Sequence, residues 1–420
     1  MNMDRIIIKG GKKLTGEITI SGAKNSVLPI LFATLLTDEP TTITNVPSLI
    51  DVEIAISLLN FIGKKTIKYG NIVKTYISNK YKYTLPYELV QKMRASILAV
   101  GPLLARIRKI KISFPGGCAI GARPIDMHLK AFTSLGVKIL NIDRNFIKIY
   151  AEKELLGTNI NLRFPSVGTT ENILLASVLA KGNTTINNAA CEPEIVDLIT
   201  VLNKMGARII GAGTKKIHIV GVSKLRGFCH KIIPDRVEAA TYILAAAITK
   251  GEIVIKETIP KHLRVINNKL RKSGLHIKEY ENTIHVKWIK NLIPQNITTN
   301  VYPGFPTDIQ AQWMVLMCLL NGNTRIEEKI FENRFLHVSA LRRFGANILT
   351  KGNTVYIKGV KKFLGTSVSV SDLRAGAALI LAGLAAEGET IISKIEHIYR
   401  GYDTIEKKLE KLNATIKKIR

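Results

Sequence analysis

In Lys204-Met205-Gly206-Ala207 a helix-like pattern ends and a strand-like pattern begins, and the same transition recurs along the whole chain. The equivalent positions are Gly63, Gly136, Gly206, Gly274, Gly345 and Asn413, separated by 73, 70, 68, 71 and 68 residues. Helices often end with a residue in the left-handed conformation, usually glycine and sometimes asparagine, which fits the exchange in the last copy. The chain is therefore interpreted as six copies of a unit of about 70 residues.

A second signature alternates with the first, and it joins an alanine-rich helical pattern to a strand. Its copies start at Gly182, Gly251, Gly322 and Gly388, with a variant at 39–43 in the first repeat and no clear copy in the second. Each unit thus holds two helices and several strands, in a βαβαββ-like order.

Helical segments such as 241–249 are apolar nearly all round, so we expect them to be buried. Six units with buried inner helices and outer sheets would form two globules of three units each. Periodicity alone does not distinguish this arrangement from a linear array.

Length and composition indicate a multidomain globular protein with a large positive charge. The 420 residues exceed one ordinary core, and 46% hydrophobic with 22% charged residues is typical of folded proteins. The net charge of +29 raises the question of nucleic-acid binding. The basic residues are scattered, however, and the densest run, 106–111, alternates with isoleucine without aromatic residues to stack bases. We therefore attribute most of the charge to a compositional bias towards lysine and isoleucine.

The cysteines and histidines indicate neither a metal site nor a disulfide framework. Cys118, Cys191, Cys229 and Cys318 form no CxxC pair, and the histidines are dispersed. We expect no metal and no cofactor, and we expect Cys318 to be a buried apolar residue. The first residues lack a signal-peptide layout, and the longest uncharged apolar stretch, 375–386, is too short to span a membrane, so we expect a cytoplasmic protein.

The segment 114–124 has the composition of a catalytic loop. A strand-like run ends at Pro115, two glycines allow unusual backbone angles, and the thiol of Cys118 lies five residues before Arg123. A guanidinium can lower a thiol pKa and can bind an anion. A glycine-rich turn with an incidental cysteine is the alternative interpretation.

Several strings along the chain form one ordered pattern. They are Ser21-Gly22-Ala23-Lys24-Asn25, Met93-Arg94-Ala95-Ser96, Pro115-Gly116-Gly117-Cys118, Gly121-Ala122-Arg123-Pro124, Ser166-Val167-Gly168, Glu192-Pro193-Glu194-Ile195-Val196-Asp197, Pro234-Asp235-Arg236, Phe305-Pro306-Thr307-Asp308-Ile309-Gln310-Ala311-Gln312, Glu332-Asn333-Arg334, Ser371-Asp372-Leu373-Arg374-Ala375 and Arg400-Gly401-Tyr402. This pattern resembles the enolpyruvyl transferases over essentially the whole chain.

The resemblance implies an α/β fold of two inside-out α/β barrels, built from six βαβαββ-like repeats. One domain would consist of residues 1–23 and 234–420, and the other, with a mobile cysteine loop, of residues 24–233. The active site would lie in the cleft between them.

The resemblance also implies a reaction. The enolpyruvyl group of phosphoenolpyruvate would be transferred to the 3-hydroxyl of UDP-N-acetylglucosamine, with release of phosphate, by addition and elimination. This is the first committed step of peptidoglycan synthesis. The attacking hydroxyl must lose a proton and the methylene carbon must gain one, so a base and an acid are needed.

The resemblance assigns the base to Asp308 and the acid to Cys118, which is also the cysteine that fosfomycin alkylates in the family. Asp308 follows a Phe-Pro-Thr turn at the start of a helical pattern. The alternative role of the Thr307-Asp308 pair is that of a helix N-cap.

Both substrates are anionic, so cations must line the site. The resemblance assigns Lys24, Arg123 and Arg400 to the phosphate of phosphoenolpyruvate, and Arg334 and Arg374 to its carboxylate. The remaining predicted contacts, to the nucleotide sugar and its reacting hydroxyl, are Asn25, Arg94, Pro124, Ile125, Asp126, Met127, Ser166, Val167, Gly168 and Ile330.

Two features of the nucleotide contacts leave alternatives open. The turn at 166–168 could donate backbone N–H groups to the diphosphate, or it could be a plain helix entry. Some family members have a lysine just before this turn, whereas this chain has Arg163-Phe164-Pro165, so Arg163 is the candidate replacement.

Three other functions remain as alternatives. The sister enzymes that use shikimate 3-phosphate share the fold, but the cysteine loop and the string 192–197 argue against that acceptor. A basic RNA-binding protein would show salt-sensitive RNA affinity. A degraded copy that only binds ligands is disfavoured by the intact set Lys24, Cys118, Asp308 and Arg400. The sequence does not indicate an oligomeric state.

Overall fold

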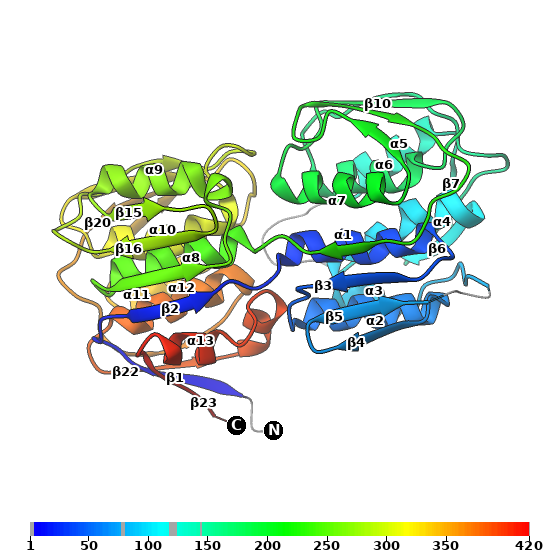
Figure 1. Cartoon of the computed structure of the whole chain (residues 1–420). Coiled ribbons are helices and arrows are strands. Elements are labelled where there is room, and N and C mark those ends of the chain that lie inside the picture. Colours follow the sequence, from blue (N-terminus) through cyan, green and yellow to red (C-terminus); the bar gives the residue numbers. More distant parts are fainter. Residues whose placement is uncertain (1–3, 77–79, 117–123, 143–144, 420) are drawn as a thin grey trace. The chain divides into compact units, whose positions relative to one another are not determined.

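The computed structural model describes residues 4–76, 80–116, 124–142 and 145–419 (Figure 1). The described residues divide into two compact units. The terminal unit consists of residues 4–21 and 234–419, and the middle unit consists of the described residues between 22 and 233. Each unit is built from three repeats around its own hydrophobic core.

The terminal unit has three four-stranded sheets among its described residues, in the orders β15-β16-β14-β2, β17-β18-β20-β19 and β21-β22-β1-β23. The strands are β1 (Arg5–Lys9), β2 (Thr15–Thr19), β14 (Glu252–Lys256), β15 (His276–Glu279), β16 (Thr283–Lys287), β17 (Ile297–Thr298), β18 (Asn323–Glu327), β19 (Asn347–Lys351), β20 (Thr354–Lys358), β21 (Ser367–Ser369), β22 (Glu389–Ser393) and β23 (Thr415–Ile419). Because β1 lies between β22 and β23, and β2 pairs with β14, the start of the chain completes two of these sheets.

The described part of the middle unit also forms three sheets, in the orders β13-β3-β5-β4, β6-β8-β7 and β11-β12-β10-β9. The strands are β3 (Thr41–Thr44), β4 (Thr66–Tyr69), β5 (Ile72–Thr75), β6 (Lys109–Ser113), β7 (Lys138–Asn141), β8 (Phe146–Tyr150), β9 (Asn159–Asn161), β10 (Asn183–Asn187), β11 (Arg208–Ile210), β12 (Lys216–Val220) and β13 (Cys229–Lys231). In the three-stranded sheet, a parallel bridge from Thr84 to Lys111 takes the place of the fourth strand.

The inner helix of each repeat is buried, and an outer helix packs beside each sheet. The inner helices are α1 (Lys24–Ala33), α4 (Val100–Ile107), α6 (Val167–Ser177), α8 (Arg236–Ile248), α10 (Gln310–Cys318) and α12 (Leu373–Ala385). The others are α2 (Ile50–Ile62), α3 (Tyr87–Lys92), α5 (Asp126–Ser134), α7 (Pro193–Lys204), α9 (Arg264–Ser273), α11 (Val338–Arg343) and α13 (Ile405–Lys411), with 3₁₀ turns at Thr34–Leu36, Arg94–Ala99, Pro260–Leu263, Thr307–Ile309 and Ile395–Arg400.

Figure 1 shows α8, α10 and α12 inside the terminal unit, with its sheets on the outside. All residues of α10 are buried, and α8 exposes little more than Arg236 at its start. A helix that is apolar on every side gains from burial on every side. The expectations of buried inner helices, outer sheets and a buried Cys318 are confirmed.

The residues that end the helix before the strand in each repeat have the predicted left-handed backbone conformation. The six helix-ending positions all have positive φ, from 67° at Asn413 to 117° at Gly63. The second repeat has its own strand start after all, because Arg108 takes a φ of 58° directly before β6. A non-glycine residue in that conformation is uncommon, which is why the sequence pattern concealed this copy.

Gly251 departs from the other glycines of the second signature. Lys250 takes the positive φ of 54° instead, while a Cβ on Gly251 would lie 2.2 Å from the backbone oxygen of Leu14. Here glycine is required by the close approach of another chain segment rather than by its φ angle.

The two chain connections between the units are hydrogen-bonded to each other. Asp235 N donates to Ser21 O at 2.9 Å, and Ala23 N donates to Ile233 O at 2.7 Å. The middle unit therefore begins and ends at neighbouring points.

Candidate functional site

Asp308 lies in the terminal unit, in the 3₁₀ turn that leads into α10. Its carboxylate caps neither that turn nor α10, so the N-cap interpretation is wrong. Instead, Oδ1 accepts a hydrogen bond from Nη2 of Arg334 at 2.7 Å, and Oδ2 accepts one from Nη2 of Arg374 at 2.8 Å. The structure thus brings three of the predicted site residues into direct contact.

The two guanidinium groups are buried, whereas the carboxylate is partly accessible. The side chains of Arg334 and Arg374 are 5% and 6% exposed, and that of Asp308 is 29% exposed. Burial alone would raise the pKa of Asp308, but Arg374, Arg334 and, more weakly, Arg236 hold it far below its usual value. Asp308 is consequently ionised at neutral pH, and in this state it is a weak base.

Arg374 is held in place by the start of its own helix. Asp372 caps α12 by accepting from the backbone N–H groups of Arg374 at 3.0 Å and Ala375 at 3.1 Å. The guanidinium of Arg374 lies over the ring of Tyr402, 5.8 Å from its centre. The hydroxyl of Tyr402 in turn contacts Thr241 at 2.9 Å and Gln312 at 3.1 Å. These contacts fix the direction from which Arg374 reaches Asp308.

Glu328 connects the segments that carry Asp308 and Arg334, and sequence analysis missed it. Its buried carboxylate accepts from the hydroxyls of Thr299 and Thr307, both at 2.8 Å. It also accepts from the backbone N–H groups of Ile330 at 2.8 Å and Phe331 at 3.2 Å. The predicted contact residue Ile330 is thus positioned by Glu328, which has no recognisable signal in the sequence beyond following a strand.

His337 lies close to Arg334 and is also buried. Burial is the main cause that lowers the pKa of His337 from 6.5 to about 4; the charge of Arg334 acts in the same direction and Asp372 opposes it. The ring is therefore neutral at pH 7. The predicted ligand Arg400 ends the 3₁₀ turn Ile395–Arg400, two residues before Tyr402, and is half-buried.

In the middle unit, Lys24 is the first residue of α1, and Asn25 follows it. The ammonium of Lys24 pairs with Asp51 of α2 at 2.7 Å, and the Asp51 side chain is 3% exposed. Asp51 is a second residue that sequence analysis missed. A buried carboxylate at this distance fixes the orientation of the lysine ammonium, which an anion ligand requires.

Most of the predicted nucleotide contacts lie at the starts of α5 and α6. Ser166 is the N-cap of α6 and accepts from Thr169 N at 3.4 Å, so the turn 166–168 is a helix entry, which leaves its first backbone N–H groups at the positive end of the helix dipole. A Cβ on Gly168 would lie 3.5 Å from the ring of His128 in α5.

Further predicted contacts lie in the same region, whereas Asn25 lies in α1 and Ile330 in the terminal unit. Ile125, Asp126 and Met127 lie at the start of α5, where Asp126 pairs with Arg163 at 2.6 Å. Arg163, the candidate replacement for the lysine of some family members, is thereby paired with a predicted contact residue. Nη2 of Arg94 donates to the carbonyl oxygen of Pro124 at 3.4 Å.

Cys118 and Arg123 lie outside the described residues, although the chain on the N-terminal side of them is described. Gln91 of α3 donates through Nε2 to Phe114 O at 2.5 Å, and Gly116 N donates to Val90 O at 3.4 Å. A Cβ on Gly116 would lie 1.7 Å from Gln91 O, so only glycine fits there.

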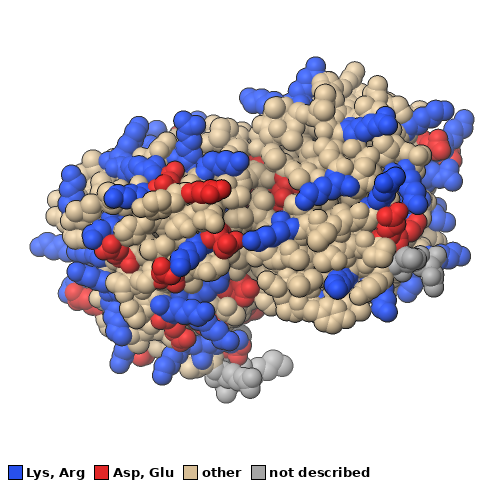
Figure 2. Space-filling model, viewed as in Figure 1, with Lys and Arg blue, Asp and Glu red and all other residues tan. Residues whose placement is uncertain are grey.

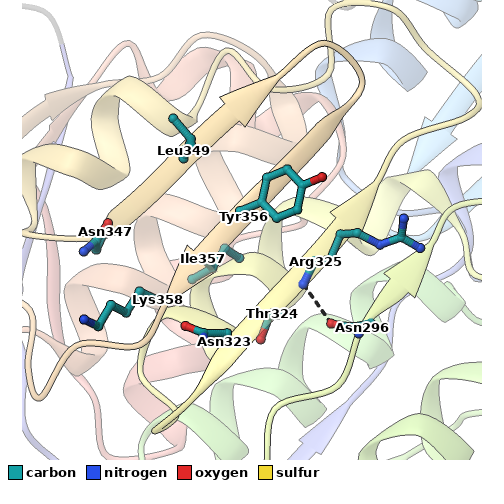
Figure 3. A pocket seen from close by; sticks show the side chains of 9 residues that line it. All are labelled: Asn296, Asn323, Thr324, Arg325, Asn347, Leu349, Tyr356, Ile357 and Lys358. Atoms are coloured by element: carbon teal, nitrogen blue, oxygen red, sulfur yellow. Dashed lines mark hydrogen bonds between the residues drawn. The ribbon is translucent and has the colours of Figure 1, made fainter.

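A hollow of about 430 Å³ lies elsewhere, on the outer face of the sheet β17-β18-β20-β19 (Figure 3). Its lining residues are Asn296, Asn323, Thr324, Arg325, Asn347, Leu349, Tyr356, Ile357 and Lys358. This lining includes no carboxylate, thiol or imidazole, so it lacks the base that the predicted reaction needs.

The positive charge is spread rather than concentrated on the face that Figure 2 shows, where lysine and arginine side chains are scattered. Within the described ranges, no three acidic, histidine or cysteine side chains gather as a metal site would require. None of the helices in the described part of the chain is long and apolar enough to cross a membrane.

Comparisons with known proteins give one consistent result. The family model described as EPSP synthase (3-phosphoshikimate 1-carboxyvinyltransferase) matches residues 8–409. The chain is 65% identical over 415 residues to the UDP-N-acetylglucosamine 1-carboxyvinyltransferase of Endomicrobium trichonymphae, covering 99% of both chains. It is 50% identical over 417 residues to the enzyme of the same name from Geotalea uraniireducens, covering 99% of this chain and 100% of the relative.

Solved structures resemble the fold at lower sequence identity. The enolpyruvyl transferase NikO from Streptomyces tendae aligns with a TM-score of 0.90 and 24% identity, over 99% of each chain. An EPSP synthase from Acinetobacter baumannii aligns with a TM-score of 0.78 and 18% identity, over the full length of both. The expected fold class is confirmed by these likenesses.

Proposed function

The chain belongs to the enolpyruvyl (carboxyvinyl) transferase family, and from this membership we propose that it transfers the enolpyruvyl group of phosphoenolpyruvate to UDP-N-acetylglucosamine, the first step of peptidoglycan synthesis. The observation that carries this function is the 65% identity, over 99% of both chains, to a relative named for that reaction. The family model is named for a different acceptor, shikimate 3-phosphate. The choice of UDP-N-acetylglucosamine as acceptor therefore rests on the 65% sequence identity to that relative.

The proposed chemistry is an addition followed by an elimination. The 3-hydroxyl oxygen of the sugar attacks C2 of phosphoenolpyruvate and loses its proton, while C3 gains a proton. The resulting tetrahedral ketal then loses a proton from C3 and expels phosphate, which restores the double bond. Atoms balance because C3 gains one proton and later loses one, and the proton of the hydroxyl passes to the base, from which it is released to solvent or to the departing phosphate.

Asp308 is the proposed base and Cys118 the proposed acid. Asp308 is supported by its ionised state and by its 29% exposed side chain among buried cations. Cys118 lies outside the described residues, so its role rests on the family pattern alone.

The cations have separate proposed tasks. Arg334 and Arg374 bind the carboxylate of phosphoenolpyruvate, and Lys24, Arg123 and Arg400 bind its phosphate. The nucleotide sugar is held by Asn25 and Arg94, by the start of α5, by the turn 166–168 and by Ile330. Both units thus contribute residues to the reaction. A cleft between them, a cytoplasmic location and a reaction without cofactor stay predictions.

The test is phosphate release from phosphoenolpyruvate with each acceptor in turn. We expect release with UDP-N-acetylglucosamine and none with shikimate 3-phosphate. The reverse pattern would show that the chain is a sister enzyme, and release with neither would remove the proposed function.

A further inference from the structure

The carboxylate of Asp308 occupies an anion site made by two buried arginines. It does not accept hydrogen bonds from all of the buried donors of that site. Each guanidinium gives Asp308 a single hydrogen bond, from Nη2 of Arg334 and from Nη2 of Arg374. The Nε–H of Arg334 is buried and has no hydrogen-bond acceptor. A buried donor without an acceptor is rare, because its desolvation is not compensated.

An arginine that uses Nε and Nη2 together binds a carboxylate with two parallel hydrogen bonds. Asp308 does not complete that arrangement, since its two oxygens are divided between two arginines. A second carboxylate placed against Arg334 could accept from both nitrogens and would satisfy the orphaned Nε–H.

Two buried guanidinium groups need a counter-charge in the absence of ligand, because an unpaired buried charge is costly. Asp308 supplies it, and it can be reached from solvent, whereas Arg334 and Arg374 are nine-tenths buried or more. Burial of the two guanidinium groups is thus compensated in the free protein by a carboxylate that is itself partly exposed.

We propose that Asp308 is an internal stand-in for the substrate carboxylate: phosphoenolpyruvate displaces it from Arg334 and Arg374, and this displacement frees it to act as the base. This inference rests on the proposed function for the identity of the ligand. It makes substrate binding and activation of the base one event, since the same two arginines cannot fully satisfy both carboxylates.

The consequence for the chemistry follows from the electrostatics. Arg374 and Arg334 lower the pKa of Asp308 while they donate to it. When their hydrogen bonds pass to a ligand carboxylate, the pKa of Asp308 rises towards its ordinary value and the group becomes a better proton acceptor. Before the substrate binds, the base is held inactive.

The experiment is calorimetric titration of the full chain with phosphoenolpyruvate and, separately, with inorganic phosphate. Asp308→Asn keeps the shape of the side chain but removes the competing charge. We expect this variant to bind phosphoenolpyruvate about tenfold or more tightly than the parent protein, with little change for phosphate. The ligand contrast separates displacement from a general loss of negative charge, which would favour both anions alike.

The matched control is Glu279→Gln, which changes another carboxylate that pairs with an arginine in the same unit. Glu279 accepts from Arg271 at 2.7 Å, with both side chains about one-third exposed. We expect its affinities to equal those of the parent protein. A second variant, Arg334→Lys, keeps the charge but removes Nε, and we expect about tenfold weaker phosphoenolpyruvate binding.

Equal tightening for both anions, weaker or unchanged binding of phosphoenolpyruvate by Asp308→Asn, or no binding by any variant would overturn the inference. If Asp308→Asn does not fold, the titration of Arg334→Lys with phosphoenolpyruvate tests the inference instead. An affinity equal to that of the parent protein would then overturn the inference. Phosphate release by the parent protein with UDP-N-acetylglucosamine is measured in parallel. If the parent protein releases phosphate but Asp308→Asn does not bind phosphoenolpyruvate more tightly, only the displacement of Asp308 is refuted. If Asp308→Asn binds more tightly but the parent protein releases no phosphate, only the proposed function is refuted.

Discussion

At the scale of the residue, the defining feature is a carboxylate whose protonation is controlled by its neighbours. Asp308 is ionised because Arg374 and Arg334 outweigh the effect of burial on its pKa. Sequence analysis predicted these three residues as parts of one site, but only through the family resemblance. Their direct contact, and the supporting roles of Glu328 and Asp51, depend on segments far apart in the chain, so no local pattern could have revealed them.

Replacing Asp308 with alanine is expected to abolish turnover, because no other group is proposed to take the hydroxyl proton. Binding of UDP-N-acetylglucosamine should remain measurable, since most of its proposed contacts lie in the middle unit. Steady-state phosphate release measures turnover, and calorimetric titration with UDP-N-acetylglucosamine measures binding. Turnover within about tenfold of the parent protein would contradict a role as base.

Lys64 gives a pH-dependent prediction of stability. Its side chain is fully buried, and Nζ donates to Thr37 O at 2.7 Å. Burial lowers the pKa of Lys64 from 10.5 to about 8, against the opposing effect of Asp38. Between these two pH values the unfolded chain binds more protons than the folded one, so the free energy of unfolding gains a contribution that increases with pH.

Lys64→Met should remove that contribution, so the slope of unfolding free energy against pH should be less positive than that of the parent protein between about 8 and 10. Urea unfolding at a series of pH values measures the slope. Lys351→Met, which changes an exposed lysine of β19, is the control and should keep the slope of the parent protein. An unchanged slope for Lys64→Met would contradict the assignment.

At the scale of the element, the six repeats are the part of the fold that the sequence predicted best. A helix-ending glycine or asparagine is a local feature with a strict backbone requirement, so it leaves a visible signal. The second repeat shows the limit of this reasoning. Arg108 takes the positive φ there instead of a glycine, and Thr84 contributes a single bridge instead of a strand. The second signature therefore has neither its glycine nor its parallel strand in this repeat.

Gly345→Ala tests the conformational requirement alone. The φ of Gly345 is 97°, and no atom lies within 4 Å of an added Cβ. The variant should lose about 1 kcal/mol of unfolding free energy through backbone strain alone. Gly251→Ala should lose more, because its Cβ would lie 2.2 Å from Leu14 O. Denaturant unfolding measures both, and a neutral Gly345→Ala would argue against strain at the repeat boundary.

At the scale of the whole molecule, the chain forms two units whose cores do not share residues. The described residues of the middle unit all lie between 22 and 233, and the hydrogen bond from Ala23 N to Ile233 O holds the two ends of this range together. The terminal unit instead needs both chain ends, since β1 and β2 complete its sheets. The sequence predicted a discontinuous domain only through the family resemblance, because repeat periodicity does not specify which repeats group together.

Residues 22–233 expressed alone should therefore fold. We expect a single cooperative thermal transition and a helix and strand content that matches the middle unit, measured by circular dichroism. Residues 234–419 alone, without β1 and β2, are the control and should not unfold cooperatively. A middle unit that lacks a cooperative transition would contradict an independent core.

The central claim is that this chain moves an enolpyruvyl group onto UDP-N-acetylglucosamine. The most direct measurement is mass spectrometry of the nucleotide sugar after incubation with phosphoenolpyruvate and the full-length protein, together with the amount of phosphate released. We predict conversion to a product that is heavier by one enolpyruvyl group, with one phosphate released per product formed. Unchanged UDP-N-acetylglucosamine, with or without phosphate release, would contradict the account.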